Sequence, residues 1–339
     1  MLYIFLIIFL LFNITIFFQL DKISKFINIY DEPDNKRKLH LKKTPILGGL
    51  IFFSNLLIFL IFLKIYYSDN FFYLLYLEDL GQFYLWFIIG TILFIVSIYD
   101  DYIEIENFKK LVVILLLVYA YVNSDQTIHI KEFRFFNNEY NFFINNFSII
   151  FTSACMLSLI IATNMYDGIN TNSLGYFLFA FLFIFFKSEY NIFILFIVFN
   201  LLFLLYLNFF GKLFMGDSGV NFLSFILGFV IIKMYNLQLI NHIEEVALMI
   251  FYPCLDMARV FLFRFLSKKS LFQADRIHLH HLVKDKYEKN HIYIMLIVNV
   301  LPFALILIFP NYLHISLIVC LVFYIFLLAK TSFKDVQNF

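Results

Sequence analysis

Eleven apolar stretches, each about long enough to cross a membrane, dominate this sequence. A spanning helix needs roughly 20 predominantly apolar residues, because the hydrocarbon core of a bilayer is about 30 Å thick. The candidate spans are residues 1–20, 46–66, 83–99, 108–123, 147–163, 173–187, 191–209, 219–236, 244–263, 291–309 and 312–330. Because 63% of the residues are apolar and 14% are charged, we predict an all-α polytopic integral membrane protein with about 11 transmembrane helices.

Two of these stretches need a separate argument. Residues 173–210 are too long for one span, and the polar cluster at 187–191 divides them into two. The first stretch has no basic segment before it and no small-residue cleavage site before Asp21, so we predict a retained helix and not a secretory signal. No linker or internal repeat separates the spans, so residues 1–339 are predicted to form a single membrane-embedded domain.

The placement of lysine and arginine predicts the orientation, because positive charge is held on the cytoplasmic side. The segment 21–45 carries seven basic residues and should be cytoplasmic. Alternating from there places the N-terminus outside and the C-terminus in the cytoplasm. Only five basic residues then fall outside: Lys64, Lys131, Arg134, Lys187 and Lys233.

The polar motifs all fall in the predicted cytoplasmic segments, which are about 21–45, 100–110, 164–172, 210–218 and 264–290. A membrane transporter, the alternative class of function, would instead carry ionisable groups near the midplane of the bilayer and inverted repeats. Acidic and histidine motifs at span ends on one side favour a catalytic surface, although a catalytically silent scaffold is a third alternative.

Each motif has a functional and a structural interpretation. Asp100-Asp101 could act as a proton acceptor and its brace, or could be a solvated helix end. Asn164 and Asp167 would share a helix face, or could form an Asx turn, while the neutral residues 170–172 suit a nucleoside or sugar. Asp217, between glycines, offers hard oxygen to Mg²⁺, or could simply cap the helix that follows.

The segment 275–281 packs a guanidinium and three imidazoles beside a carboxylate. A transition-metal site is one interpretation of its His-x-His-His pattern. Phosphate binding suits the arginine better, because a guanidinium makes bidentate contacts to phosphate oxygens. The residues concerned are Arg276, His278, His280 and His281.

Five ordered blocks stand out in the sequence: Arg37-Lys38-Leu39-His40 with Pro45 and Gly48-Gly49, then Asp100-Asp101, Asn164 to Gly168, Met215 to Gly219, and Asp275 to His281. Together they resemble the polyprenyl-phosphate N-acetylhexosamine-1-phosphate transferase superfamily, nearest its bacterial undecaprenyl-phosphate GlcNAc-1-phosphate branch. The resemblance implies that undecaprenyl phosphate attacks a UDP-N-acetylhexosamine, with UDP-GlcNAc as the expected donor, and that UMP is released. This reaction would start a cell-envelope polysaccharide such as O-antigen or a teichoic acid linkage unit.

The resemblance also implies roles for the motif residues. Asp217 and Asp167 would bind Mg²⁺, with Mn²⁺ as an alternative; Asp100 would deprotonate the lipid phosphate and Asp101 would support it. Arg37, Lys38, His40, Asn164, Asp167, Arg276, His278, His280 and His281 would bind substrate. The site would face the cytoplasm from a bacterial inner membrane, with lipid substrate, bilayer and a homodimer as partners and no nucleic acid. A UDP-MurNAc-pentapeptide or another UDP-sugar is the runner-up donor, and an aspartyl intermediate is an alternative to direct attack.

Three positions depart from the pattern of that superfamily. Asn170 stands where an aspartate is usual, Val220 replaces a serine, and Asp31 lies one residue further than usual from Arg37. We expect Asn170→Asp to be tolerated or to improve Mg²⁺ dependence. The three cysteines, Cys155, Cys254 and Cys320, are predicted to be buried in apolar surroundings. Residues 127–135 alternate apolar and polar side chains, and with a turn at Asn137-Asn138 they are predicted to form the first strand of a small hairpin.

Overall fold

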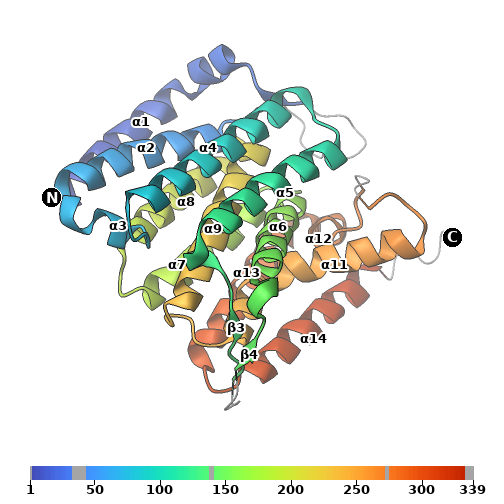
Figure 1. The fold of residues 1–339 in the computed structure, drawn as a ribbon. Coiled ribbons are helices and arrows are strands. Elements are labelled where there is room, and N and C mark those ends of the chain that lie inside the picture. Colours follow the sequence, from blue (N-terminus) through green and yellow to red (C-terminus); the bar gives the residue numbers. More distant parts are fainter. Residues whose placement is uncertain (1, 33–42, 137–140, 272–274, 333–339) are drawn as a thin grey trace.

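The computed structural model describes residues 2–32, 43–136, 141–271 and 275–332 and shows a bundle of helices (Figure 1). The helices are α1 (Leu2–Ile27), α2 (Gly48–Tyr66), α3 (Phe71–Leu74), α4 (Leu80–Ile103), α5 (Asn107–Ser124), α6 (Ser148–Tyr166), α7 (Asn172–Lys187), α8 (Ile192–Phe209), α9 (Gly216–Asn236), α10 (Ile243–Met249), α11 (Phe251–Leu266), α12 (Leu279–Tyr287), α13 (His291–Ile308) and α14 (Leu313–Ser332). Strands are confined to two antiparallel two-residue pairs: β1 (Tyr30–Asp31) with β2 (Thr44–Pro45), and β3 (Glu132–Phe133) with β4 (Phe142–Phe143).

Each of the eleven predicted spans coincides with helix. Among the described residues, nine helices are long and apolar enough to cross a membrane. The other two predicted spans are irregular: α7 has 16 residues, and α10 and α11 are bent by 73° at a break between them. These findings confirm an all-α polytopic membrane protein, and the count of eleven crossings stays a prediction.

Two helices differ from the sequence-based boundaries. The first helix was expected to end near residue 20, but α1 continues to Ile27 and ends at Asn28, whose φ is +57°. The second difference is α12, which lies in a segment expected to be a loop. Its polar composition excludes it from a search for apolar spans, so hydropathy alone does not reveal it.

Helix α9 forms the centre of the bundle, because each residue from Ser218 to Tyr235 is buried. A helix that is apolar on all sides is stable only when other helices surround it. Small residues let its neighbours approach closely: Gly49 of α2 packs against Gly219, and Gly90 of α4 packs against the rings of Phe222 and Phe225. The Gly216–Gly219 motif at the start of α9 is therefore held on a rigid element.

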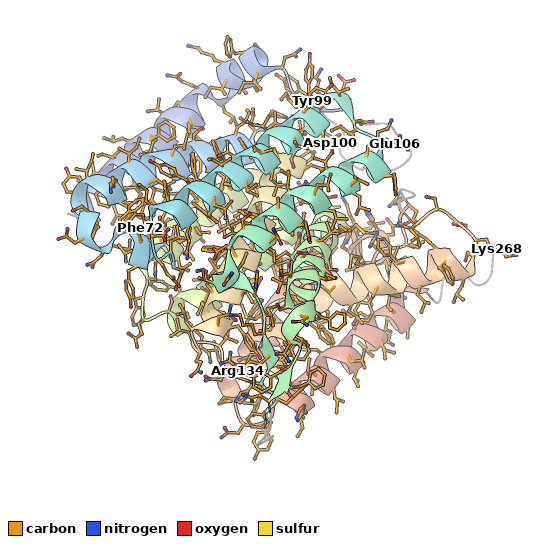
Figure 2. The ribbon with its side chains drawn as sticks, in the orientation of Figure 1. Phe72, Tyr99, Asp100, Glu106, Arg134 and Lys268 are labelled. Atoms are coloured by element: carbon orange, nitrogen blue, oxygen red, sulfur yellow. The ribbon has the colours of Figure 1, made fainter. Side chains whose placement is uncertain are left out.

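The two ends of the bundle carry different sets of residues. Figure 2 shows Asp100, Glu106 and Lys268 toward one end, and Phe72 and Arg134 toward the other. The second end holds the β3–β4 pair, and β3 lies within the predicted strand 127–135. Residues 126–128 form a 3-10 turn and not a strand. The expected turn at Asn137-Asn138 lies outside the described residues. Segments predicted to share a membrane side thus lie together.

The three cysteines lie within helices and form no disulfide. Cys320 is buried as predicted, whereas Cys155 and Cys254 are half-buried. None of them contributes to the site described next.

Candidate active site

A cavity of about 920 Å³ lies at the end of the bundle that carries Asp100. It is lined by the end of α4, the start of α5, the end of α6, the start of α9 and the start of α12, together with the segments that join them. Of the predicted site residues, Asp100, Asp101, Asn164, Asp167, Asp217, His278 and His281 line it. Motifs separated by up to about 180 residues are thereby brought to one place.

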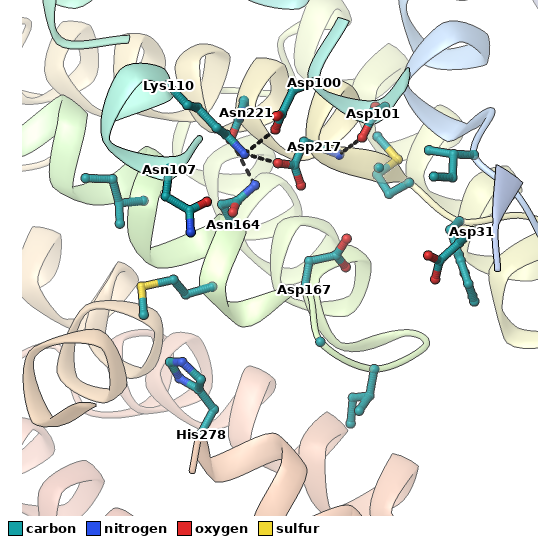
Figure 3. A pocket seen from close by; sticks show the side chains of 18 of the residues that line it. Asp31, Asp100, Asp101, Asn107, Lys110, Asn164, Asp167, Asp217, Asn221 and His278 are labelled. Carbon is teal, nitrogen blue, oxygen red and sulfur yellow. Dashed lines mark hydrogen bonds and ion pairs between the residues drawn. The ribbon is translucent and has the colours of Figure 1, made fainter. Parts of the chain in front are cut away.

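A lysine joins two of the acidic motifs. The Nζ atom of Lys110, on α5, lies 2.7 Å from Oδ2 of Asp100, and it also forms an ion pair with the carboxylate of Asp217 (Figure 3). Lys110 and Asp100 are largely buried, whereas about a third of the Asp217 side chain is exposed. Two carboxylates this close need a cation between them, because like charges repel strongly away from water.

Asp101 holds the start of α9. Its Oδ1 accepts the backbone N–H of Asp217 at 2.8 Å, and its Oδ2 accepts that of Ser218 at 3.0 Å. A carboxylate from α4 therefore caps α9, and no side chain of the Gly216–Gly219 motif caps its own helix. Gly216 has a φ of +72°, and a Cβ there would collide with Ile46 and the Asp101 carboxylate. The helix start is shaped around Asp101.

A chain of amides links three helices behind the acids. Asn164 donates to Oδ1 of Asn221 at 3.3 Å, and Asn221 in turn donates to the hydroxyl of Ser97 at 3.0 Å. Asn164 and Asn221 both line the cavity. Satisfied polar groups of this kind fix the relative positions of α4, α6 and α9.

Asp167 follows the last residue of α6 and faces the cavity, as Asn164 does one turn earlier (Figure 3). Its carboxylate accepts a hydrogen bond from the hydroxyl of Ser173. Burial raises the pKa of Asp167 to about 6, and the hydrogen bond from Ser173 opposes that rise. Because burial destabilises the anionic form of this carboxyl, a nearby cation would stabilise it.

The histidine motif meets the Asp167 turn directly. A Cβ on Gly168 would collide with the rings of His280 and His281. His278 and His281 line the cavity, whereas the His280 ring is fully buried and stacks against His278 with ring centroids 5.5 Å apart. We therefore correct the prediction for His280: it supports its neighbours and does not face the cavity.

Arg276 was predicted to bind phosphate, but it is not among the residues that line the cavity. Its guanidinium forms an ion pair with Asp285 of α12. Among the described residues, the arginine that lines the cavity is Arg264, at the end of α11, whose Nε donates to Asp275 at 3.0 Å. Arg37, Lys38 and His40 lie outside the described residues.

Asn170 also lines the cavity, and its amide has a structural partner there. Its Nδ2 donates to the backbone carbonyl of Asn208 at 3.2 Å. The side chain of Asn208 accepts the N–H of Thr171 at 2.6 Å and donates to the carbonyl of Leu213 at 3.0 Å. Asn170, which departs from the superfamily pattern, therefore acts here as a hydrogen-bond donor, and an ionised aspartate could not do so.

The sequence interpretation did not single out Lys110, Asn208, Asn221 or Arg264. Lys110 stands close to an acidic pair at a span end, but the positive-inside bias alone also explains a basic residue in a cytoplasmic segment. Asn221 is a polar residue inside an apolar span, where such groups usually have a specific partner. No local pattern distinguishes Asn208 or Arg264 from ordinary residues near a span end.

The carboxylates that line the cavity are candidate ligands for Mg²⁺. In the described part of the chain, no group of three or more His, Cys, Asp and Glu side chains is arranged to hold a metal ion. The transition-metal interpretation of the histidines therefore has no support there. Mg²⁺, however, is usually bound by one or two carboxylates together with substrate phosphates and water. Asp217 already attracts a cation, and Asp167 lines the same cavity, so these carboxylates fit that mode of binding.

Comparison with known proteins tests the resemblance. No curated protein matches the sequence. Residues 83–235 match the model of glycosyl transferase family 4, and this range includes Asp100, Asp101, Asn164, Asp167 and Asp217. This segment, slightly under half of the chain, is thus similar to glycosyl transferase family 4, the family of polyprenyl-phosphate hexosamine-1-phosphate transferases.

Proposed function

We propose that the protein transfers GlcNAc-1-phosphate from UDP-GlcNAc to undecaprenyl phosphate, with release of UMP, in a Mg²⁺-dependent reaction. The lipid-linked product would start a cell-envelope polysaccharide. The family supports a sugar-phosphate transfer to a polyprenyl phosphate. The UDP-GlcNAc donor, Mg²⁺ and the polysaccharide pathway go beyond the family match and are part of this proposal.

The observation that carries the proposal is the contact of Lys110 with both Asp100 and Asp217 inside a cavity at the end of a membrane bundle. A lipid phosphate lies at the membrane surface, which is where this cavity lies if the helices span the bilayer. Transfer of a phosphoryl-type group depends mainly on positioning and on neutralising charge. Acids, a lysine and histidines around one cavity can supply both.

Asp100 would accept the proton of the lipid phosphate. Its Oδ1 accepts the backbone N–H of Ile105 at 2.6 Å and its Oδ2 contacts Lys110, so the carboxylate is held in one orientation. An oxygen of the lipid phosphate then attacks the β-phosphorus of the donor. The new P–O bond forms as the bond from that phosphorus to the bridging oxygen breaks, and UMP leaves with the bridging oxygen.

Asp217 and Asp167 would hold Mg²⁺, which when bound supplies positive charge to the diphosphate. Lys110 would then shift its contact from Asp217 toward the phosphates. Asn164, Asn221 and Asn170 offer neutral hydrogen-bonding groups on the same wall. They suit the uridine or the sugar, since neither carries a charge.

UDP-GlcNAc is favoured as donor by the His-x-His-His form of the last motif. In the structure, two of these rings, His278 and His281, line the cavity that the acids also line. We place the cavity on the cytoplasmic face of a bacterial inner membrane, because the basic segments flank it and UDP-sugars are cytoplasmic substrates.

The test is UMP release by the purified protein in detergent, with undecaprenyl phosphate and Mg²⁺. UDP-GlcNAc, UDP-GalNAc and UDP-MurNAc-pentapeptide are compared, with Asp217→Asn as the blank. Lipid-dependent release with UDP-GlcNAc alone is the expected result. Release with a different UDP-sugar would make that sugar the donor in place of UDP-GlcNAc. No lipid-dependent release with any of the three would overturn the proposal.

A further inference from the structure

A buried aspartate outside the predicted motifs lies behind the histidines. Asp256, on α11, is 1% exposed. Its Oδ2 lies 2.7 Å from Nδ1 of His278, at the edge of the ring away from Nε2. The backbone N–H of Leu279 donates to the same carboxylate, at 3.2 Å to Oδ1.

The other partners of Asp256 are donors as well. Arg259 donates from Nη2 to Oδ1 at 2.8 Å, and the hydroxyl of Tyr324, on α14, donates to Oδ1 at 2.7 Å. A carboxyl surrounded by a guanidinium, a phenol and a peptide N–H is ionised, and an ionised carboxylate can only accept. Nδ1 of His278 must therefore carry a proton that it donates to Asp256.

This assignment determines what His278 presents to the cavity that it lines. With Nδ1–H bound to Asp256, Nε2 is the ring nitrogen left for a substrate. In a ring that carries protons on both nitrogens, Nε2 is a donor to an anionic oxygen. Carboxylates orient imidazoles in this way in many catalytic and metal sites.

The contact also fixes the segment that carries the histidines. Arg259 donates to the carbonyl of Ile277 at 2.6 Å, and its Nε donates to Tyr324 at 2.7 Å. Helices α11 and α14 are thus joined to residues 277–279 through a single buried carboxylate. Four hydrogen-bonded partners around Asp256 leave the His278 ring little freedom to turn.

We propose that Asp256 is a positioning residue for the transfer reaction: it holds His278 with Nδ1 protonated and Nε2 directed at the diphosphate of the donor. This inference rests on the proposed function for its substrate. The contact between the two residues is independent of that function, and this allows the two to be tested separately.

A double-mutant cycle tests the inference. Asp256→Asn, His278→Gln and the double variant are compared with the parent for kcat and KM of UMP release. Asp256→Asn should lower kcat/KM by about 10- to 100-fold, as the loss of a partner that orients a histidine does elsewhere. In the His278→Gln background, Asp256→Asn should lower kcat/KM by less than about twofold, because the effects of two residues that act through one another do not add.

Tyr324→Phe is the matched control, since it removes another donor to Asp256 and leaves the contact with His278 intact; its kcat/KM should stay within about threefold of the parent. Should Asp256→Asn fail to accumulate in the membrane because Arg259 loses its charge partner, Asp256→Glu keeps that charge and enters the same cycle. Full additivity of the two losses, or parent-like activity of a folded Asp256→Asn, would overturn the proposal.

The melting temperatures of the four proteins in detergent provide a readout without turnover. A smaller shift for Asp256→Asn in the His278→Gln background than in the parent supports the contact, and equal shifts refute it. If the parent releases no UMP with any donor, the proposed function fails, and the melting temperatures alone decide whether Asp256 positions His278.

Discussion

The Nζ atom of Lys110 lies 2.7 Å from Oδ2 of Asp100, so a cation already sits between the first acidic motif and the third. We expect this lysine to compete with Mg²⁺ for Asp217. In Lys110→Met the Mg²⁺ concentration for half-maximal UMP release should fall about tenfold, the equivalent of about 1.4 kcal/mol of lost competition. At saturating Mg²⁺, kcat should also fall, because the diphosphate loses a positive charge.

Lys109→Met is the control for this change, because Lys109 is exposed and pairs with Glu106 outside the acid cluster. It should leave the Mg²⁺ titration unchanged. A Mg²⁺ requirement that rises in Lys110→Met would show that the lysine assists metal binding and does not compete with it.

Asp217→Asn should abolish turnover while the protein stays folded in the membrane. A loss of at least about 10³-fold is expected when a charged group that acts on the transferred phosphate is removed. The measurement is UMP release at ordinary Mg²⁺, with size-exclusion behaviour in detergent as the check of folding. Asp285→Asn, which removes a carboxylate from the exposed pair with Arg276, serves as control. Retained activity in Asp217→Asn would rule out the metal assignment.

Gly216→Ala should destabilise the protein and reduce activity. Its φ of +72° disfavours any side chain, and the added Cβ would push against Ile46 and Asp101. Strain of this kind costs on the order of 1–3 kcal/mol. Gly228→Ala, in the same helix, meets only ordinary contacts at 3.5 Å or more and should be close to neutral. Equal melting temperatures for the two variants would contradict the assigned backbone constraint.

Asn170→Asp should lower the melting temperature. The sequence alone suggested that this change would be tolerated, but Asn170 donates to the carbonyl of Asn208, and a carboxylate would face that carbonyl without a proton to share. A loss of about 1–3 kcal/mol is typical when a buried acceptor loses its donor. Asn170→Ala separates the lost hydrogen bond from the added repulsion. An aspartate variant as stable as the parent, with improved Mg²⁺ dependence, would restore the first expectation.

The stability of the metal-free protein should depend on Asp167. Burial raises the pKa of this carboxyl from 3.8 to about 6. The folded state therefore binds the proton more tightly than the unfolded chain does. Above pH 6 the buried charge lowers the free energy of unfolding, and this destabilisation is relieved as the pH falls through about 6. With EDTA present, Asp167→Asn should raise the melting temperature more at pH 8 than at pH 5. The same difference at both pH values would show that the carboxyl has an ordinary pKa.

The spans were predictable because lipid imposes a length and a composition that hydropathy detects. The break between α10 and α11 was missed, although Pro253 gives a signal: it has no N–H for the carbonyl of Met249, and the chain bends at Ile250. Helix α12 was missed because its residues are too polar for a span. Sequence patterns that report burial in lipid say little about helices at its edge.

The site was predictable where its residues stand in motifs at span ends, as Asp100, Asp167 and Asp217 do. Pairing was not predictable, since Lys110 and Asp256 owe their roles to partners 107 and 22 residues away in the chain. Arg276 was assigned to the site because it adjoins the histidines in sequence, yet its partner is Asp285. Its role in binding phosphate stays a prediction, and the arginine seen to line the described cavity is Arg264.

The fit of Gly168 against the ring of His280 has a consequence for the history of this protein. These positions are 112 residues apart, and neither can change size alone: a larger residue at 168 needs a smaller one at 280, and a smaller ring at 280 leaves a hole beside the Asp167 turn. Substitutions at the two positions should therefore appear together in related sequences. A lineage that loses the glycine without altering the histidine would have to reshape the wall of the cavity.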